Sequence, residues 1–230
     1  MAYLRKHSMI TKETFSFIKN LAANNNRDWF AENRKSYDEA RGEVLNLLTE
    51  IQGELNIADK IEEAKIYRIN RDVRFSKDKS PYKMCFSGYY KRAGAARRGS
   101  YYFSIQPGGQ TIVGGGFYGP NKDDLLRIRK EFEMDTSEIE KITSNQNFIT
   151  HFGSLQGGGV KSAPRDFNKE HPNIKWIRMK QFYAFRSFTD KEVLDPSFCK
   201  EMMSTFMAIR PFFDYMSDVL TTNINGESLL

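Results

Sequence analysis

The stretch SYYFSIQPGGQTIVGGGF, residues 100–117, decides the fold class of this chain. It holds two runs of aromatic and β-branched residues, at 99–106 and 110–117, with a short segment of proline and glycine between them. Runs of this composition, bounded by turn residues, predict β-strands. So short a connection favours antiparallel neighbours, because a parallel return needs a dozen residues or more.

The same reasoning extends to both sides of this pair. Further strand patterns occur at residues 64–75, 83–90 and 181–188. Helical periodicity, with apolar residues three or four positions apart, follows Thr11 and recurs at 27–55, 121–133, 137–144 and 196–220. The sequence therefore predicts an α+β fold, in which a mainly antiparallel sheet of about five strands packs with N-terminal and C-terminal helices.

Composition limits the class of protein. The chain has 230 residues, of which 40% are hydrophobic, so it can bury a sizeable core. We expect a single domain over residues 11–220, with an N-terminal tail at 1–10 and a C-terminal tail at 221–230. Two cysteines form no disulfide framework, and no apolar run is long enough to span a membrane. A cytoplasmic protein with no membrane partner is expected, and its oligomeric state stays open.

The basic residues are concentrated in one window. The formal net charge is +6, whereas residues 60–100 alone hold twelve Lys or Arg and four Asp or Glu, a local balance of +8. The rest of the chain is slightly acidic. A localised positive excess attracts phosphates, nucleic acid or acidic partners, and it also suits an ordinary solvated surface.

The centre of this window is YRINRDVRFSKDKSPYK, residues 67–83. If the strand prediction holds to its end, side chains alternate between faces, and Phe75 faces the core together with Arg71. Arg71 would then need an internal acid or an external anion, because an unpaired buried charge costs several kcal/mol. Arg68 and Arg74 would lie on the opposite face.

Three interpretations of this segment stay open. The first, which the sequence favours because no recognised nucleic-acid module is visible, is a site for a small phosphate- or carboxylate-bearing ligand, with or without a chemical reaction. The second is nucleic-acid binding through the basic window. The third is a structural or partner-binding surface whose arginines form internal salt bridges. The candidate ligand-binding residues are Arg68, Arg71, Arg74, Lys77, Lys79 and Lys83, with Asn33, Arg34 and Lys180 as neighbours.

No complete catalytic motif identifies a reaction. The glycine-rich stretches at 114–120 and 155–162 lack the ending of a phosphate loop, and we interpret both as turns. The three histidines lie far apart and no Cys-x-x-Cys pair occurs, so no metal site is predicted, although scattered carboxylates that bind magnesium leave no local pattern. Enzyme activity and cofactors stay undetermined. Asp72 and His171 are the candidate acid–base residues.

Several segments together resemble a known family. They are NNNRDWF at 24–30, RDVRFSKDKSPYK at 71–83, the Gln-Pro-Gly region ending at Gly108, the Leu-x-x-Ile-Arg pattern at 125–129, and the PRDFNKEHPNIKWIRMK segment at 164–180. They are similar to the bacterial and fungal family called domain of unknown function 2461, from about Thr11 to beyond Phe213. No activity or catalytic residue is established for that family. The resemblance therefore implies a single-domain, intracellular protein and transfers no residue roles.

Overall fold

The computed structural model describes residues 8–223 and 225–230. These residues divide into two compact units. Unit 1 comprises residues 8–90, 102–113 and 187–204, and unit 2 comprises the remaining described residues. Most of the tail expected at 1–10 and position 224 of the other tail lie outside the described residues. The expectation of one domain over 11–220 stays a prediction.

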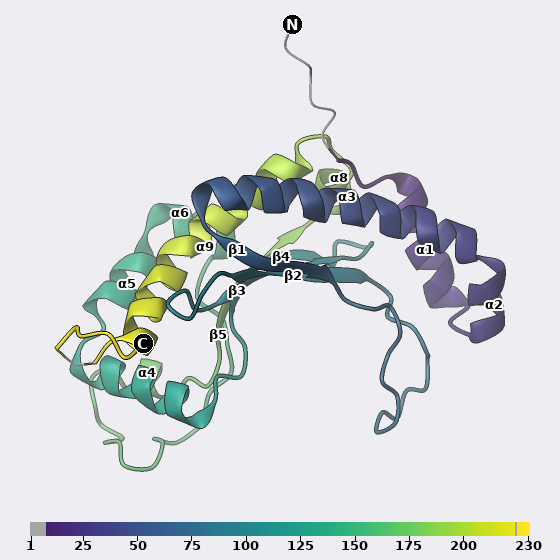
Figure 1. The fold of residues 1–230 in the computed structure, drawn as a ribbon. Helices are drawn as coiled ribbons and strands as arrows, with labels where there is room; N and C mark the ends of the chain where they lie inside the picture. Colours follow the sequence, from purple (N-terminus) through teal and green to yellow (C-terminus); the bar gives the residue numbers. More distant parts are fainter. Residues whose placement is uncertain (1–7, 224) are drawn as a thin grey trace, which may run out of the picture. The chain divides into compact units, whose positions relative to one another are not determined.

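The described strands form one five-stranded sheet. The strands are β1 (Ile61–Ile66), β2 (Phe86–Arg92), β3 (Ser100–Ile105), β4 (Thr111–Phe117) and β5 (Phe182–Phe188). Their order in the sheet is their order in the chain, and the sheet is antiparallel. With helices before and after these strands, the predicted α+β class is confirmed (Figure 1).

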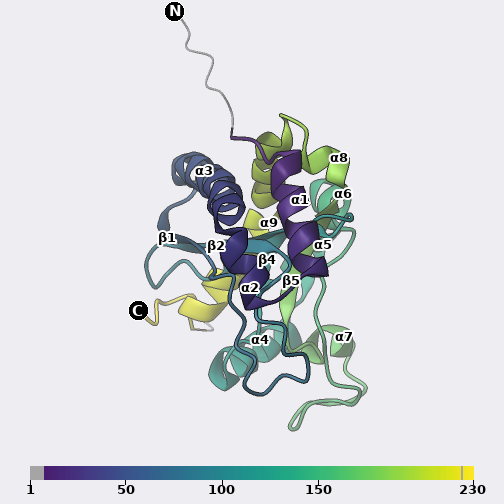
Figure 2. The same ribbon diagram turned by 90° about the vertical axis from the view of Figure 1, so that its right-hand side faces the viewer.

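Unit 1 contains the N-terminal helices α1 (Lys12–Ala23), α2 (Arg27–Glu32) and α3 (Arg34–Ala58), the short α8 (Asp190–Val193) and the start of α9 (Phe198–Thr221). Helices α1 and α3 lie side by side, and α3 packs on β1 (Figure 2). The helix predicted over 27–55 is divided at Asn33, whose side-chain amide donates to the Trp29 carbonyl at 2.8 Å. This bond ends α2 before α3 begins.

Aromatic side chains fill the interior of unit 1 where α1, α2 and α3 meet. Phe17 lies 5.9 Å from Tyr37 and 6.2 Å from Phe86, measured between ring centroids. Phe30 lies 5.0 Å from Tyr37 and stacks on Tyr82 at 4.1 Å. All five rings are buried, and their contacts hold the helices of the unit and the start of β2 together.

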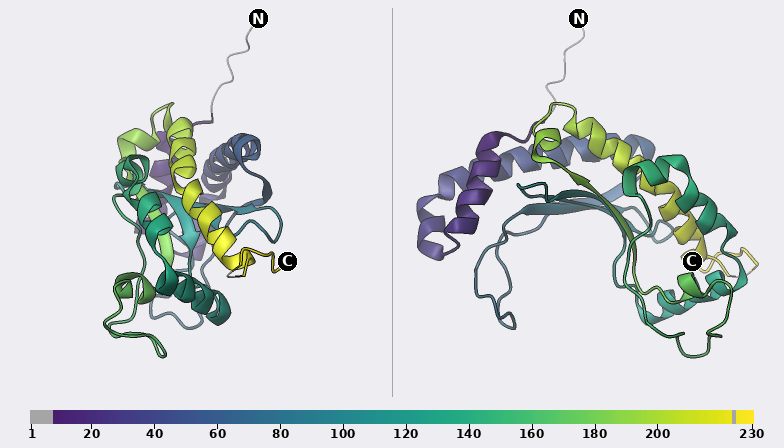
Figure 3. Two further views of the ribbon diagram at one scale, coloured as in Figure 1. Left: turned by 90° about the vertical axis from the view of Figure 1, so that its left-hand side faces the viewer. Right: turned by 180° about the vertical axis from the view of Figure 1, so that it is seen from behind.

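Unit 2 contains α4 (Lys122–Met134), α5 (Ser137–Ser144), α6 (Gln146–Phe152), α7 (Ile174–Ile177) and most of α9. Helix α4 packs against α7, and α5 against α6 (teal and green in Figure 3). Asn121 caps α4, as the sequence predicts, by accepting from the backbone N–H groups of Asp123 and Asp124. None of the helices in the described ranges is long and apolar enough to cross a membrane.

The three consecutive glycines at 114–116 are a correction to the sequence analysis, which interpreted them as part of a turn. They lie inside β4. A Cβ atom on Gly114 would lie 2.0 Å from the Ala184 carbonyl oxygen of β5, and one on Gly115 would lie 2.3 Å from the Ser100 carbonyl oxygen of β3. The neighbouring backbones approach so closely that only glycine fits.

We expect Gly114→Ala to lower the free energy of unfolding by about 3 kcal/mol or more, because the added methyl group forces β4 and β5 apart. The matched control is Gly158→Ala, also in unit 2, where the nearest atom to the added Cβ would be 3.9 Å away. Urea unfolding followed by the fluorescence of Trp176 measures both, in a Trp29→Phe background that leaves the reporter in unit 2 alone. Equal loss of stability in the two variants would contradict the steric argument.

Candidate functional site

The connection between β1 and β2 carries most of the predicted site residues, and we call residues 67–83 the basic loop. The predicted strand at 64–75 is too long, because β1 ends at Ile66. Beyond it the chain turns back on itself. The Arg71 N–H donates to the Pro81 carbonyl and the Lys83 N–H to the Ile69 carbonyl, both at 2.8 Å. The basic loop is therefore an irregular hairpin that extends away from the strands of unit 1 (Figure 1).

Arg71 lies inside this hairpin and holds it closed. Its guanidinium donates to the Asp78 carboxylate at 2.5 Å and to the Ser80 carbonyl at 3.1 Å. It also reaches the Ser76 hydroxyl at 3.5 Å. The side chain is 27% exposed, and its partners are one acid and two further oxygens of the same loop.

The pKa of Asp78 is lowered from 3.8 to about 2, first by hydrogen bonds from the Ser80 hydroxyl and N–H and then by Arg71. A carboxyl group whose pKa is lowered on folding stabilises the folded form fully above pH 3.8. That contribution is lost as the pH falls through about 2. The ion pair between Asp78 and Arg71 thus persists across the neutral and mildly acidic pH range.

The other cations of the basic loop lie at its surface. Arg74 is 76% exposed and donates to both oxygens of Asp72, at 3.0 and 2.6 Å. Lys79 donates to the Val73 carbonyl at 3.0 Å, which ties the two arms of the loop together. Arg68 and Lys77 are exposed. Lys83 is half-buried, with its ammonium 5.1 Å from the centre of the Tyr67 ring.

The expectation that Phe75 faces the core was wrong. The strand pattern placed it in the core, whereas its side chain is 96% exposed at the far end of the basic loop. The Arg74 guanidinium lies 6.0 Å from the centre of its ring. Because β1 ends before this position, the alternation of faces does not reach it. The loop therefore presents an aromatic ring to solvent among cations.

The base of the basic loop is fixed by the asparagine segment that precedes α2. The Asn25 side-chain amide donates to the Tyr82 carbonyl at 3.0 Å, and its oxygen accepts from the Tyr82 N–H at 3.1 Å. One side chain thereby satisfies both backbone groups of a residue 57 positions away, in the manner of a neighbouring strand. The adjacent stack of Phe30 on Tyr82 completes the anchor.

The remaining predicted site residues are not all brought to the loop. Asn33 and Arg34 lie at the junction of α2 and α3 in unit 1, where Arg34 pairs with Asp38 at 3.1 Å. His171 and Lys180 belong to unit 2. The Asn173 N–H donates to His171 Nδ1 at 3.1 Å, and the Lys180 side chain is exposed.

Asp72 is a poor general base. Hydrogen bonds from Arg74 lower the pKa of its carboxyl group, and the nearby charge of Arg68 acts in the same direction. Its role and that of His171 as acid–base residues stay predictions.

One cluster of potential metal ligands occurs among the described residues. Glu50 and Glu54 of α3 and Cys199 of α9 place their ligand atoms within 4.8 Å of one another. Burial, followed by the nearby glutamates, raises the pKa of the Cys199 thiol to about 12, so a metal would have to displace its proton. No local sequence pattern predicts this cluster, because Cys199 lies far from the glutamates along the chain.

We expect Asn25→Ala to lower the free energy of unfolding by about 1–3 kcal/mol, because it leaves both backbone groups of Tyr82 without their partner. It should also speed trypsin cleavage of the basic loop at Arg74, Lys77 and Lys79. The control is Asn24→Ala, since the Asn24 side chain is exposed and bonds only the Asn20 carbonyl. Urea titration and limited proteolysis measure the two effects. Identical behaviour of the two variants would show that the anchor does not hold the loop.

Comparison with known proteins gives a family and no activity. A search of curated proteins and a search of solved structures gave no significant match. Residues 13–215, most of the chain, match the family described as conserved hypothetical protein (DUF2461). Two of the segments behind the resemblance, 24–30 and 71–83, meet in the structure where Asn25 and Phe30 contact Tyr82. The chain therefore belongs to the DUF2461 family of conserved hypothetical proteins.

Proposed function

We propose that the basic loop binds single-stranded nucleic acid, with its cations on the phosphates and Phe75 against a base. The observation that carries this proposal is the exposure of Phe75 on a loop fixed by its own hydrogen bonds. A phenylalanine ring in water costs free energy that burial against a partner would recover. The surrounding cations would attract phosphates, and the exposed ring would stack on a flat base.

Charge supports the same class of ligand. The exposed cations of the loop include Arg68 near its base and Arg74 and Lys77 farther along it, and the 60–100 window has a balance of +8. Cations spread over a projecting loop suit the repeated charges of a polynucleotide backbone. Binding of this kind releases counterions and weakens steeply with salt. Stacking of a base on an aromatic side chain is worth about 1–3 kcal/mol and tolerates any sequence.

A small anionic ligand is the second candidate, and one observation favours it. The Arg71 guanidinium already holds a carboxylate, that of Asp78, beside the Ser76 and Ser80 hydroxyl-bearing residues. A phosphate would find the same donors. It would first have to displace Asp78, and for this reason we rank a small anion below an extended one. Neither candidate includes a chemical step.

We expect fluorescence anisotropy with a labelled oligothymidylate at low salt to detect binding, and Phe75→Ala to weaken it by about tenfold, from the loss of one stacked base. The triple variant Arg68→Gln/Arg74→Gln/Lys77→Gln should reduce the slope of log affinity against log salt by about 2, since about 0.7 of a counterion is released per phosphate contact.

A duplex of the same length should bind more weakly, because its bases are not free to stack on Phe75.

The matched control is Lys122→Gln/Lys141→Gln/Lys169→Gln, which removes the same charge from exposed positions of unit 2. It should leave affinity close to that of the parent chain. A control that weakens binding as much as the loop variant would indicate non-specific attraction. Thermal stabilisation by inorganic phosphate or ATP, lost in Arg71→Ala and without oligonucleotide binding, would favour the small-anion candidate.

A further inference from the structure

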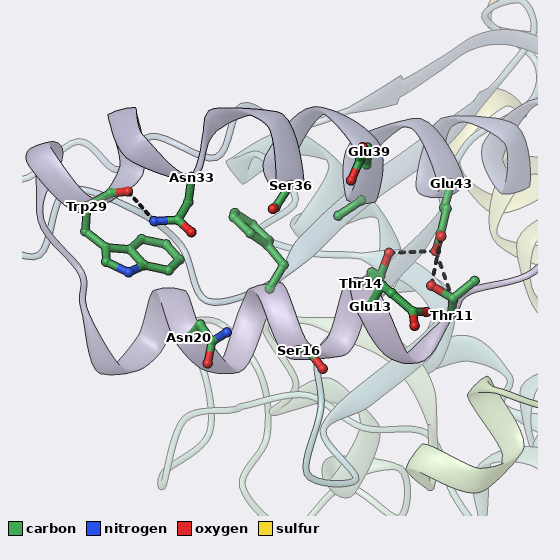
Figure 4. Close-up of a pocket in the computed structure, with 12 residues that line it drawn as sticks. Thr11, Glu13, Thr14, Ser16, Asn20, Trp29, Asn33, Ser36, Glu39 and Glu43 are labelled. Atoms are coloured by element: carbon green, nitrogen blue, oxygen red, sulfur yellow. Dashed lines mark hydrogen bonds between the residues drawn. The ribbon is translucent and has the colours of Figure 1, made fainter.

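A concave surface lies in unit 1 between α1 and α3, apart from the basic loop. It is a groove of about 500 Å³. Figure 4 shows the residues that line it along α1 and α3, with Trp29 of α2 at one end. The volume falls within the range of small-molecule sites, about 300–1,000 Å³.

One end of this groove is acidic. Glu13, Glu39 and Glu43 line it, and no lysine, arginine or histidine is among its lining residues. The Glu43 carboxylate accepts from the Thr11 N–H and hydroxyl and from the Thr14 hydroxyl, at 2.6 to 2.9 Å, so it is fixed in place. In a chain of net charge +6, a groove whose charged lining residues are all glutamates is a selective environment for a cation.

The side chains of Glu39 and Glu13 have room for a further cation. The Lys35 ammonium approaches Glu39 no closer than 3.9 Å, and both side chains are largely exposed, so this pair is weak. A hydrogen bond from its own backbone N–H lowers the pKa of Glu13, with the Thr11 side chain acting in the same direction. The Glu13 carboxylate is therefore charged at neutral pH.

The opposite end of the groove is aromatic and amide-lined. Trp29 lies there with Asn20 and Asn33 (Figure 4). The Asn33 amide nitrogen is engaged by the Trp29 carbonyl, so its oxygen is the group turned towards the groove. An indole face attracts ammonium groups, and an amide oxygen accepts a hydrogen bond from them. Between the two ends, the buried residues Phe17 and Ala40 form the apolar floor of the groove.

The length of the groove indicates the shape of its occupant. Along α3, the lining residues run from Asn33 to Glu43, which is about 15 Å at the helical rise of 1.5 Å per residue. We propose that this groove binds a linear polyamine, with one ammonium group among the glutamates, another over the Trp29 indole, and the methylene chain along Phe17. A neutral saccharide would use the indole and amides and leave the glutamates without a cation.

This proposal is independent of nucleic-acid binding by the basic loop, and its test uses a different ligand. Spermidine is titrated into the full chain carrying Trp176→Phe, so that the fluorescence change comes from Trp29, and isothermal titration calorimetry on the parent chain gives the affinity. We expect saturable binding. The double variant Glu13→Gln/Glu39→Gln should weaken it by about tenfold, and Trp29→Leu by a similar factor.

The matched control is Glu32→Gln/Glu138→Gln, which removes two exposed carboxylates outside the groove and should leave affinity unchanged. Thermal melting of each variant shows that it is folded. Any of the following results would overturn the proposal: no saturable binding of spermidine, equal weakening by the control variant, or equal competition by a neutral oligosaccharide. Equal displacement of spermidine by Mg²⁺ at the same total charge would reduce the interaction to general screening and would also overturn it.

Discussion

The link between the Asn25 side chain and the backbone of Tyr82 is the contact on which the arrangement of the candidate site depends. It joins the segment before α2 to the returning arm of the basic loop. The asparagine side-chain amide presents an N–H donor and an oxygen acceptor side by side, so one side chain pairs with both the C=O and the N–H of Tyr82, as a strand would. The Phe30 ring then covers Tyr82 from the same element. Without this anchor, the loop would be tied to unit 1 chiefly by its backbone hydrogen bonds.

Local sequence patterns singled out one of the paired arginines and missed another, whose partner is distant along the chain. The sequence singles out Arg71 as the arginine that needs either an internal acid or an external anion, and in the structure it binds Asp78. The most buried arginine of the described residues is Arg92, which is 3% exposed. It pairs with Asp214 and donates to the Arg98 carbonyl at 3.1 Å, all within unit 2. Its partner lies on α9, far along the chain, so no local pattern identified it.

The elements of the sheet were predictable where the pattern is local. The strands at 99–106 and 110–117 correspond to β3 and β4, because alternating apolar residues and a short turn are sufficient to define a hairpin. The end of β1 was not predictable. Apolar residues continue beyond Ile66, but the chain there pairs with its own returning arm and not with a sheet neighbour. The exposure of Phe75 follows from that tertiary fact.

The glycine run at 114–116 was also not interpretable from the sequence alone. A run of glycines signals either unusual backbone angles or close approach of another backbone, and composition does not distinguish the two. At 114–116 the cause is mainly close approach, since Gly114 and Gly115 have ordinary φ angles and only Gly116 has a positive one, of 148°. The distances to β3 and β5 that decide the matter exist only after the sheet has formed.

The internal ion pairs of the basic loop bear directly on whether it can serve as a binding surface. Asp72 and Asp78 neutralise two of its six cations, which leaves the loop with a balance of +4. The two pairs also order the loop before any ligand arrives. Binding then costs less conformational entropy than it would for a disordered basic segment. The two ion pairs lower the net charge of the loop but fix its conformation, so the exposed Phe75 ring is already in place for a base to stack on it.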